Sequence, residues 1–377
     1  MLNQAVSHLN KELSKKKQQH YIIDCDIHHD FPSPDVILPY LSDRWREHHL
    51  TYGFKEHHGF VHSFGLYPPV SPFASRQDGW PHNGARPGTD LEFMKAQHLE
   101  SNNVKYGILN TLFPVQTQLN DEYARALARA VNDWQIKEWL EKDSRLRASI
   151  IVPYENPEFA VEEIERVGKH PGFVQIMLLC RSKEPLGRRK YWPIYEAAEA
   201  YGLPIGMHII NGGMHGNTSS GWHSYYSEVH TSLSPGAQVQ VVSLVCEGVF
   251  KRFPKLRVVL IEAGFAWVPS LMWRLDKQYV KLKSELPHLK RLPSEYIREH
   301  FRFTTQPMEE PTVPKHFYHI LEHLGSDDLL LFATDYPHWD FDDPLKSFPV
   351  KIEQELKQKI YYKNAESIYD FKKGEIR

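Results

Sequence analysis

The sequence predicts an α/β fold, a distorted (β/α)8 TIM barrel with a long insertion after its first strand. Eight short, nearly continuous apolar runs recur along the 377 residues, and segments with helical periodicity separate them. Such runs are typical of strands buried on both faces of a parallel sheet, and the length suits a barrel with insertions. A doubly wound sheet is the main alternative, but no GxGxxG motif follows the first run.

The predicted strands alternate with predicted helices from residue 21 onward. The strands are expected at residues 21–27, 104–110, 146–153, 172–179, 203–209, 256–264, 301–305 and 329–335. The clearest helices are expected at residues 121–143, 156–169, 192–202, 268–286 and 314–325. Asn156 followed by proline is a typical helix start, and Gly202 is a typical helix end.

Two long connections interrupt this alternation. Residues 1–20 form a polar N-terminal extension, and residues 21–377 are expected to form one barrel domain. The insertion at residues 31–90 is too long for an ordinary barrel loop, so we expect it to cover the barrel mouth. A second long loop, about residues 211–236, is a plausible substrate lid. We expect at most one of its histidines, His215, His223 and His230, to reach the site.

Composition excludes several classes of protein. Lysine and arginine number 45 against 47 acidic residues, which gives no indication of nucleic acid or an anionic membrane as a partner. Three separated cysteines rule out a disulfide framework. The N-terminus lacks the apolar core of a signal peptide, and no apolar stretch reaches 18 residues. These features predict a cytoplasmic protein, and its 22 histidines form a large pool of possible metal ligands.

Polar residues follow several of the apolar runs. Asp26 and His28 end the first run, His208 the fifth, Glu262 the sixth and Asp335 the eighth. Active-site residues of a barrel stand at these carboxyl ends. One such residue alone is more often structural. Carboxylates and imidazoles that converge from several strands would suit a divalent ion such as zinc, iron or manganese, because a cation removes the cost of clustered buried acids.

These residues lie in motifs that resemble an amidohydrolase-related, metal-dependent family. The resemblance is to the branch that includes aminocarboxymuconate semialdehyde decarboxylase and the resorcylate-type decarboxylases. It extends over nearly the whole chain, in order, through "IIDCDIH", "LPIGMH", "FPKLRVVLIEAGFAWVPSLMWRLD", "FTTQPMEEP", "LFATDYPHWD" and the closing "KNAESIYDF". The resemblance also implies a barrel fold and, because related enzymes are often dimers, a homodimer.

The resemblance implies one divalent metal ion, with zinc expected first and manganese or iron(II) as alternatives. The implied ligands are Asp26, His28, His208 and Asp335. Two-metal members of the family carry a carboxylated lysine on the fourth strand. Here "GFVQIMLLC" offers Gln175 and no lysine, so a single metal is expected.

The sixth strand departs from the family pattern. The decarboxylases have a histidine there, whereas this chain has Glu262. Glu262 is either a general acid or base, or a hydrogen-bonding support for a ligating histidine. His338 either contacts the substrate or braces its loop. Asp24 is expected to be a buried orienting group and not a ligand.

Three functions remain compatible with these residues. The first is a metal-dependent hydrolase of a small organic substrate, with aromatic compounds among the candidates. In it, Asp335 takes the proton of a metal-bound water while Glu262 or a loop histidine assists the leaving group. The second is a non-oxidative decarboxylase of an aromatic or unsaturated carboxylic acid. The third is a barrel that binds a metal without turnover. The glutamate at position 262 favours the hydrolase, whereas the many decarboxylases of the family that the chain resembles favour the second function. The hydrolase is the prediction, and the decarboxylase is the alternative.

Overall fold

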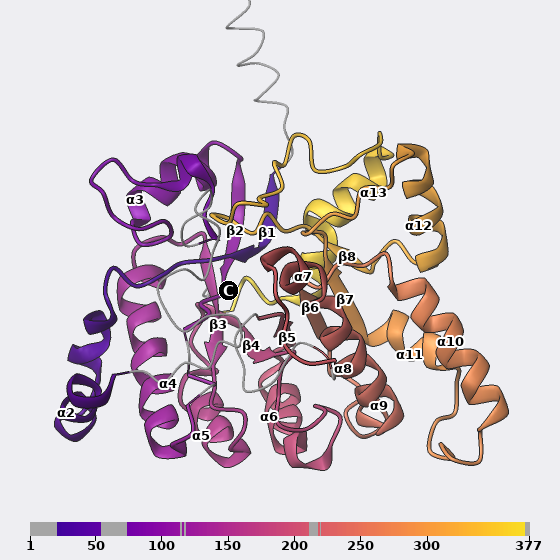
Figure 1. Cartoon of the computed structure of the whole chain (residues 1–377), viewed down its shortest axis with the longest axis horizontal. Helices are drawn as coiled ribbons and strands as arrows, with labels where there is room; N and C mark the ends of the chain where they lie inside the picture. Colours follow the sequence, from indigo (N-terminus) through magenta and orange to yellow (C-terminus); the bar gives the residue numbers. More distant parts are fainter. Residues whose placement is uncertain are drawn as a thin grey trace, which may run out of the picture.

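A parallel eight-stranded barrel forms the centre of the molecule. The computed structural model describes residues 21–53, 74–113, 115–116, 118–210, 218 and 220–373. The strands follow the order β1 to β8, and each pairs in parallel with the next along the chain (Figure 1). The strands are β1 (Ile22–Ile27), β2 (Val104–Leu109), β3 (Leu146–Ile151), β4 (Phe173–Leu179), β5 (Ile205–His208), β6 (Val258–Ile261), β7 (Phe301–Thr304) and β8 (Leu330–Leu331). The predicted barrel is confirmed.

The ring closes between β8 and β1 through the segment that follows β8. The amide of Cys25 donates to the carbonyl of Phe332 at 3.0 Å, and the amide of His28 donates to the carbonyl of Tyr336 at 2.7 Å. Asp335 donates its amide to the carbonyl of Asp26 at 3.1 Å. Strand β8 itself has only two residues, which is the distortion of the barrel. Closure therefore places Asp335 directly beside the end of β1.

Helices surround the strands, as Figure 1 shows. The α-helices are α2 (Asp43–Tyr52), α3 (Leu91–Met94), α4 (Asp121–Gln135), α5 (Pro157–Val167), α6 (Trp192–Tyr201), α7 (Tyr226–Thr231), α8 (Ser234–Cys246), α9 (Val249–Arg252), α10 (Val268–Lys281), α11 (Pro293–His300), α12 (Phe317–Leu324), α13 (Gln354–Gln358) and α14 (Asn364–Ile368). Short 3-10 or π-helical turns are η1 (Pro34–Tyr40), η3 (Gln77–Gly79), η4 (Lys95–Glu100), η5 (Ile136–Leu140), η6 (Arg189–Tyr191), η7 (Pro314–His316) and η8 (Lys359–Lys363).

The predicted helix ends follow the expected local chemistry. The side chain of Asn156 accepts the amide of Phe159 and caps α5, which begins with proline. Gly202 ends α6 in the left-handed conformation that glycine adopts without strain. Among the described residues, no helix is both long enough and apolar enough to cross a membrane.

Part of the predicted insertion contacts the loop that follows β8. Arg76 donates its amide to the carbonyl of Pro337 at 2.9 Å, and Trp339 donates its amide to the carbonyl of Ala74 at 2.6 Å. Ser75 and His338 form an antiparallel bridge. Residues 54–73 and the N-terminal extension lie outside the described residues. That the whole insertion covers the mouth stays a prediction.

Candidate metal centre

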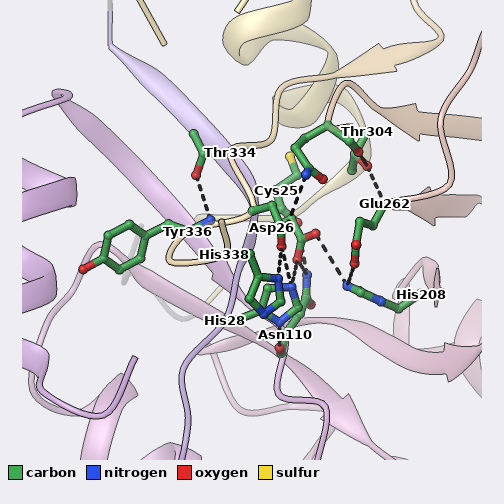
Figure 2. Close-up of polar contacts among 12 residues, drawn as sticks. Cys25, Asp26, His28, Asn110, His208, Glu262, Thr304, Thr334, Tyr336 and His338 are labelled. Atoms are coloured by element: carbon green, nitrogen blue, oxygen red, sulfur yellow. Dashed lines mark hydrogen bonds and ion pairs between the residues drawn. The ribbon is translucent and has the colours of Figure 1, made fainter. Parts of the chain in front are cut away.

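Six polar side chains meet at the carboxyl ends of the barrel strands. Asp26 and His28 come from the end of β1, His208 from the end of β5 and Glu262 from just after β6. Asp335 and His338 come from the segment after β8. Figure 2 shows the side chains of Asp26, His28, His208, Glu262 and His338 directed toward one another. Every residue predicted for the site therefore lies in one cluster.

The distances within this cluster are short. Nε2 of His28 lies 2.9 Å from Oδ1 of Asp335 and 3.3 Å from Oδ1 of Asp26. Nε2 of His208 lies 3.5 Å from Oδ2 of Asp26 and 3.5 Å from Oε2 of Glu262. Asp26, His208 and Asp335 are fully buried, and Glu262 is 8% exposed. The cluster is thus a compact, nearly dry set of nitrogen and oxygen donors.

The composition and orientation of the cluster fit a divalent metal ion. Nδ1 of His28 faces the carbonyl of Asn110 at 2.8 Å, and Nδ1 of His208 faces the carbonyl of Ile209. Each neutral ring then carries its proton on Nδ1 and presents a lone pair on Nε2. Those two nitrogens and Oδ2 of Asp26 are buried and have no hydrogen-bond partner among the described residues. Buried acceptors that face one another are costly unless a cation lies between them.

A hydrogen-bond network behind the cluster fixes Asp26. Asn110 donates its amide to Oδ1 of Asp26 at 2.8 Å. Its carbonyl oxygen accepts from Ser149 at 2.6 Å and from Gln175 at 3.1 Å. The carbonyl of Gln175 accepts the hydroxyl of Tyr369 at 3.0 Å. Gln175 therefore supports the residue that orients Asp26. Asn110 was not among the predicted site residues, although it is the last residue of the second apolar run and directly follows β2.

Asp24 lies beside the cluster and joins the ends of β1 and β8. Its Oδ1 accepts the amides of Asp26 at 3.2 Å and Thr334 at 3.0 Å. Its Oδ2 accepts the hydroxyl of Thr334 at 2.5 Å and faces Nε2 of His98 at 2.7 Å. One carboxylate thus holds the backbone beside both Asp26 and Asp335. No sequence signal singled out His98, because it belongs to a helix outside the barrel.

Two of the clustered residues have a left-handed backbone. Glu262 has φ of 57° and Asp335 has φ of 61°. This conformation is unfavourable for residues other than glycine and is found mainly at functional sites, where the surrounding structure holds it. The amide of Glu262 donates to the hydroxyl oxygen of Thr304 at 2.9 Å (Figure 2). These turns at the strand ends aim both carboxylates into the cluster.

Burial and crowding of charge shift the pKa values of the acids. Burial and the neighbouring carboxylates hold the pKa of Asp335 well above its usual value. Burial and the Asp335 carboxylate do the same to the pKa of Glu262. Burial would also raise the pKa of Asp26, but two adjacent histidines outweigh it and lower that pKa. A cation between these acids would relieve their mutual repulsion.

His338 stands at the outer side of the cluster. Its ring stacks on His28 with centroids 4.2 Å apart, and its Nδ1 lies 2.7 Å from Oδ1 of Asp335. Burial and the adjacent His28 lower the pKa of His338 to about 3. Its side chain is 19% exposed, compared with 10% for Glu262. A small molecule would therefore meet His338 and Glu262 first.

Farther out, a polar bridge links the cluster to helix α7. Gln306 donates to Oδ2 of Asp335 at 3.2 Å and to Oδ2 of Asp340 at 3.0 Å. Nε2 of His230 in α7 lies 3.2 Å from the same Asp340 oxygen. His223 instead faces the hydroxyl of Ser232 at 2.8 Å. His215 lies outside the described residues.

The barrel and its buried nitrogen and oxygen donors are the features of a metal-dependent barrel enzyme. The sequence model of the amidohydrolase family matches residues 23–371, and the chain belongs to this family. It is 26% identical to the gamma-resorcylate decarboxylase of Polaromonas sp. strain JS666 over 307 residues, which cover 77% of this chain and 90% of that enzyme.

Two solved structures share the fold. One is a dihydroxybenzoic acid decarboxylase from Polaromonas sp. JS666 with bound manganese and 2-nitroresorcinol (TM-score 0.63, 19% identity, 94% of this chain and 97% of that chain). The other is a 5-carboxyvanillate decarboxylase from Novosphingobium aromaticivorans with bound manganese and 3-methoxy-4-hydroxy-5-nitrobenzoic acid (TM-score 0.66, 17% identity, 94% and 98%).

These comparisons correct the predicted hydrolase. That prediction was wrong, because the curated relative and the two solved structures named above are all decarboxylases. It gave too much weight to Glu262 in place of the family's histidine. One side chain does not reveal whether water or substrate occupies a metal site. The preference for zinc also finds no support, since manganese is bound in both solved relatives.

Proposed function

We propose that this chain is a metal-dependent, non-oxidative decarboxylase of a small aromatic carboxylic acid. The observation that carries the proposal is the set of buried, mutually facing donor atoms of Asp26, His28 and His208. Sequence similarity to a gamma-resorcylate decarboxylase over most of both chains supports the choice of reaction. The net reaction breaks the bond between ring and carboxyl carbon, releases carbon dioxide and places a proton on the ring carbon.

We assign the metal-holding role to Asp26, His28, His208 and Asp335, with manganese as the expected ion. When bound, the ion supplies positive charge that attracts the substrate carboxylate and polarises a neighbouring oxygen. Asn110 and Asp24 hold Asp26 and Asp335 in place. The same residues without a cation would repel an anionic substrate.

Proton delivery is assigned to Asp335 and His338. The ring carbon retains the electron pair of the broken bond and needs a proton in place of the carboxyl group. Oδ1 of Asp335 and Nδ1 of His338 are 2.7 Å apart, which allows a proton to pass between them. His338 is the more exposed of the two side chains, so it connects the buried carboxyl group of Asp335 with the solvent-facing side of the site.

A cleft beside His338 has a size suited to a small aromatic acid. It measures about 570 Å³, within the usual range for ligand sites. It is lined by Ser75, Arg76, Gln77, Asp78, Trp339, Phe341 and Asp343. Ser75 in this lining forms an antiparallel backbone bridge with His338.

Carbon dioxide release provides the test. The manganese-loaded protein is offered a panel of ortho-hydroxybenzoates labelled with ¹³C in the carboxyl group, in deuterated water. We expect labelled carbon dioxide and one deuterium at the former carboxyl position. A His208→Ala variant, with one donor removed, serves as the inactive control. The proposal is refuted if the metal-loaded protein releases no labelled carbon dioxide from any ortho-hydroxy acid in the panel.

A further inference from the structure

We propose that Glu262 is itself a metal ligand, so that three carboxylates and two imidazoles hold the ion. This inference rests on the metal site of the proposed function. It concerns the carboxylate just after β6, to which the proposed function assigns no role. It replaces the roles of acid, base or hydrogen-bonding support that the sequence left open.

Which ring nitrogen of His208 faces Glu262 distinguishes a metal ligand from a hydrogen-bonding support. A residue that supports a ligating histidine bonds the ring nitrogen opposite the metal. In His208 that nitrogen is Nδ1, and the carbonyl of Ile209 already takes it. Oε2 of Glu262 instead lies 3.5 Å from Nε2, the nitrogen with no hydrogen-bond partner among the described residues. Glu262 is therefore on the ligand side, together with Oδ2 of Asp26 (Figure 2).

The donor atoms also lie close enough to share one ion. One donor atom from each of Asp26, His28, His208 and Glu262 lies within 4.8 Å of the others. A second group with the same spacing contains His28, Glu262, Asp335 and His338. Glu262 and His28 are the two residues common to both groups. An ion held by Asp26, His28 and His208 is consequently within reach of Glu262, and the second group brings Asp335 close to His28 and Glu262.

The backbone around Glu262 is fixed in the orientation that a ligand needs. The left-handed φ of 57° turns the chain at the end of β6, and Thr304 accepts the amide of Glu262. Three residues on, the carboxylate of Glu309 accepts the amides of Phe265 at 3.1 Å and Ala266 at 3.2 Å. Contacts on both sides of the turn therefore restrict Glu262, as in other preorganised sites.

A third carboxylate changes which metal the site prefers. Carboxylate oxygens suit manganese, whereas imidazole nitrogens suit zinc as well as other transition metals. Glu262 in place of a histidine thus shifts the donor set toward manganese. We expect wild-type protein to prefer manganese over zinc more strongly than a Glu262→His variant does, by about tenfold in the ratio of dissociation constants.

The direct test is a structure of the wild-type protein loaded with manganese. We expect an oxygen of Glu262 about 2.2 Å from the ion, the usual range for carboxylate ligands. A separation above about 3 Å, with the other four residues bound, overturns the inference. This measurement does not depend on any variant folding correctly.

Water proton relaxation gives a second readout in solution. In Glu262→Ala, water should replace the lost ligand, so the relaxation rate per bound manganese ion should rise and the dissociation constant should increase at least tenfold. Asp342→Asn is the matched control, because this half-buried acid belongs to none of the donor groups. It should change neither quantity more than twofold. An unchanged relaxation rate per bound ion in Glu262→Ala contradicts the inference.

The two proposals fail separately in these experiments. If Glu262 contacts manganese but no aromatic acid loses carbon dioxide, the proposed reaction is wrong and the ligand assignment stands. If carbon dioxide is released while Glu262 stays away from the ion, the reaction stands and the ligand assignment is wrong.

Discussion

Replacing Asp24 with alanine should destabilise the barrel where its first and last strands meet. The Asp24 carboxylate receives four contacts in a fully buried environment, from the amide of Asp26, the amide and hydroxyl of Thr334, and Nε2 of His98. Alanine leaves these donors without a partner. Thr334 can turn its hydroxyl elsewhere, but the two amides and the imidazole are held by their elements.

The expected loss follows from those three donors. Each buried donor left unpaired costs about 1–3 kcal/mol, and local rearrangement keeps the sum of three such losses toward the low end of that range. We therefore expect Asp24→Ala to lower the free energy of unfolding by about 4 kcal/mol. Asp24→Asn keeps the shape and one acceptor oxygen, so its loss should be about 1–2 kcal/mol.

Urea unfolding of the metal-free proteins measures both losses, because metal binding then adds nothing to stability. Refolding from urea should be checked first, since the analysis needs a reversible transition. Manganese affinity of the folded variants gives the second readout, and it should fall in both, since Asp335 loses its backbone setting. If Asp24→Ala unfolds within about 1 kcal/mol of wild type, these hydrogen bonds do not stabilise the barrel closure.

Three further predictions concern the site and its surroundings. Chelation of the metal should lower the melting temperature. Manganese at 100 times its dissociation constant should then raise the free energy of unfolding by about 2.7 kcal/mol. An unchanged melting temperature argues against a structural cation site. Asn110→Ala should weaken manganese binding by about 10- to 100-fold, measured by calorimetry, and equal affinity would remove Asn110 from the support of Asp26. Burial raises the pKa of Asp342 to about 7. Because this folded-state pKa lies above the unfolded value, the contribution of Asp342 to the free energy of unfolding falls as pH rises from about 4 to about 7. Asp342→Asn should remove that loss. The difference in free energy of unfolding between the variant and wild type should therefore grow in favour of the variant from about pH 5 to about pH 8, and a constant difference would contradict this prediction.

The strands could be predicted because each is buried on both faces. All eight apolar runs became strands, since few polar residues can enter such positions. The same rule made Asp26, His208 and Asp335 conspicuous at the strand ends. It gave no indication of His98, whose helix contacts the barrel through a side chain that periodicity does not distinguish. Contacts between distant side chains require the fold itself.

The role of Glu262 could not be read from its residue type. A glutamate beside a ligating histidine either accepts a hydrogen bond from the ring nitrogen that does not bind the metal, or binds the same metal. Which of the two applies depends on which ring nitrogen already donates to a backbone carbonyl. Here Nδ1 of His208 faces the carbonyl of the next residue, Ile209, so Nε2 is the nitrogen that faces Glu262. The reaction was equally hidden, because hydrolases and decarboxylases use the same strand ends for different purposes.

The charge of the cluster links metal binding to the proposed substrate. Asp26, Glu262, Asp335 and Asp340 bring four carboxyl groups together, and adjoining buried acids raise the pKa of Glu262 and Asp335 after burial itself. A benzoate carries a further negative charge and would be repelled by the ionised acids. A divalent ion offsets two of these negative charges and presents a positive centre to the arriving substrate carboxylate. Metal removal should therefore abolish binding of an aromatic acid as well as catalysis. Calorimetry with 3-methoxy-4-hydroxy-5-nitrobenzoic acid, the aromatic acid bound in one solved relative, would measure that loss.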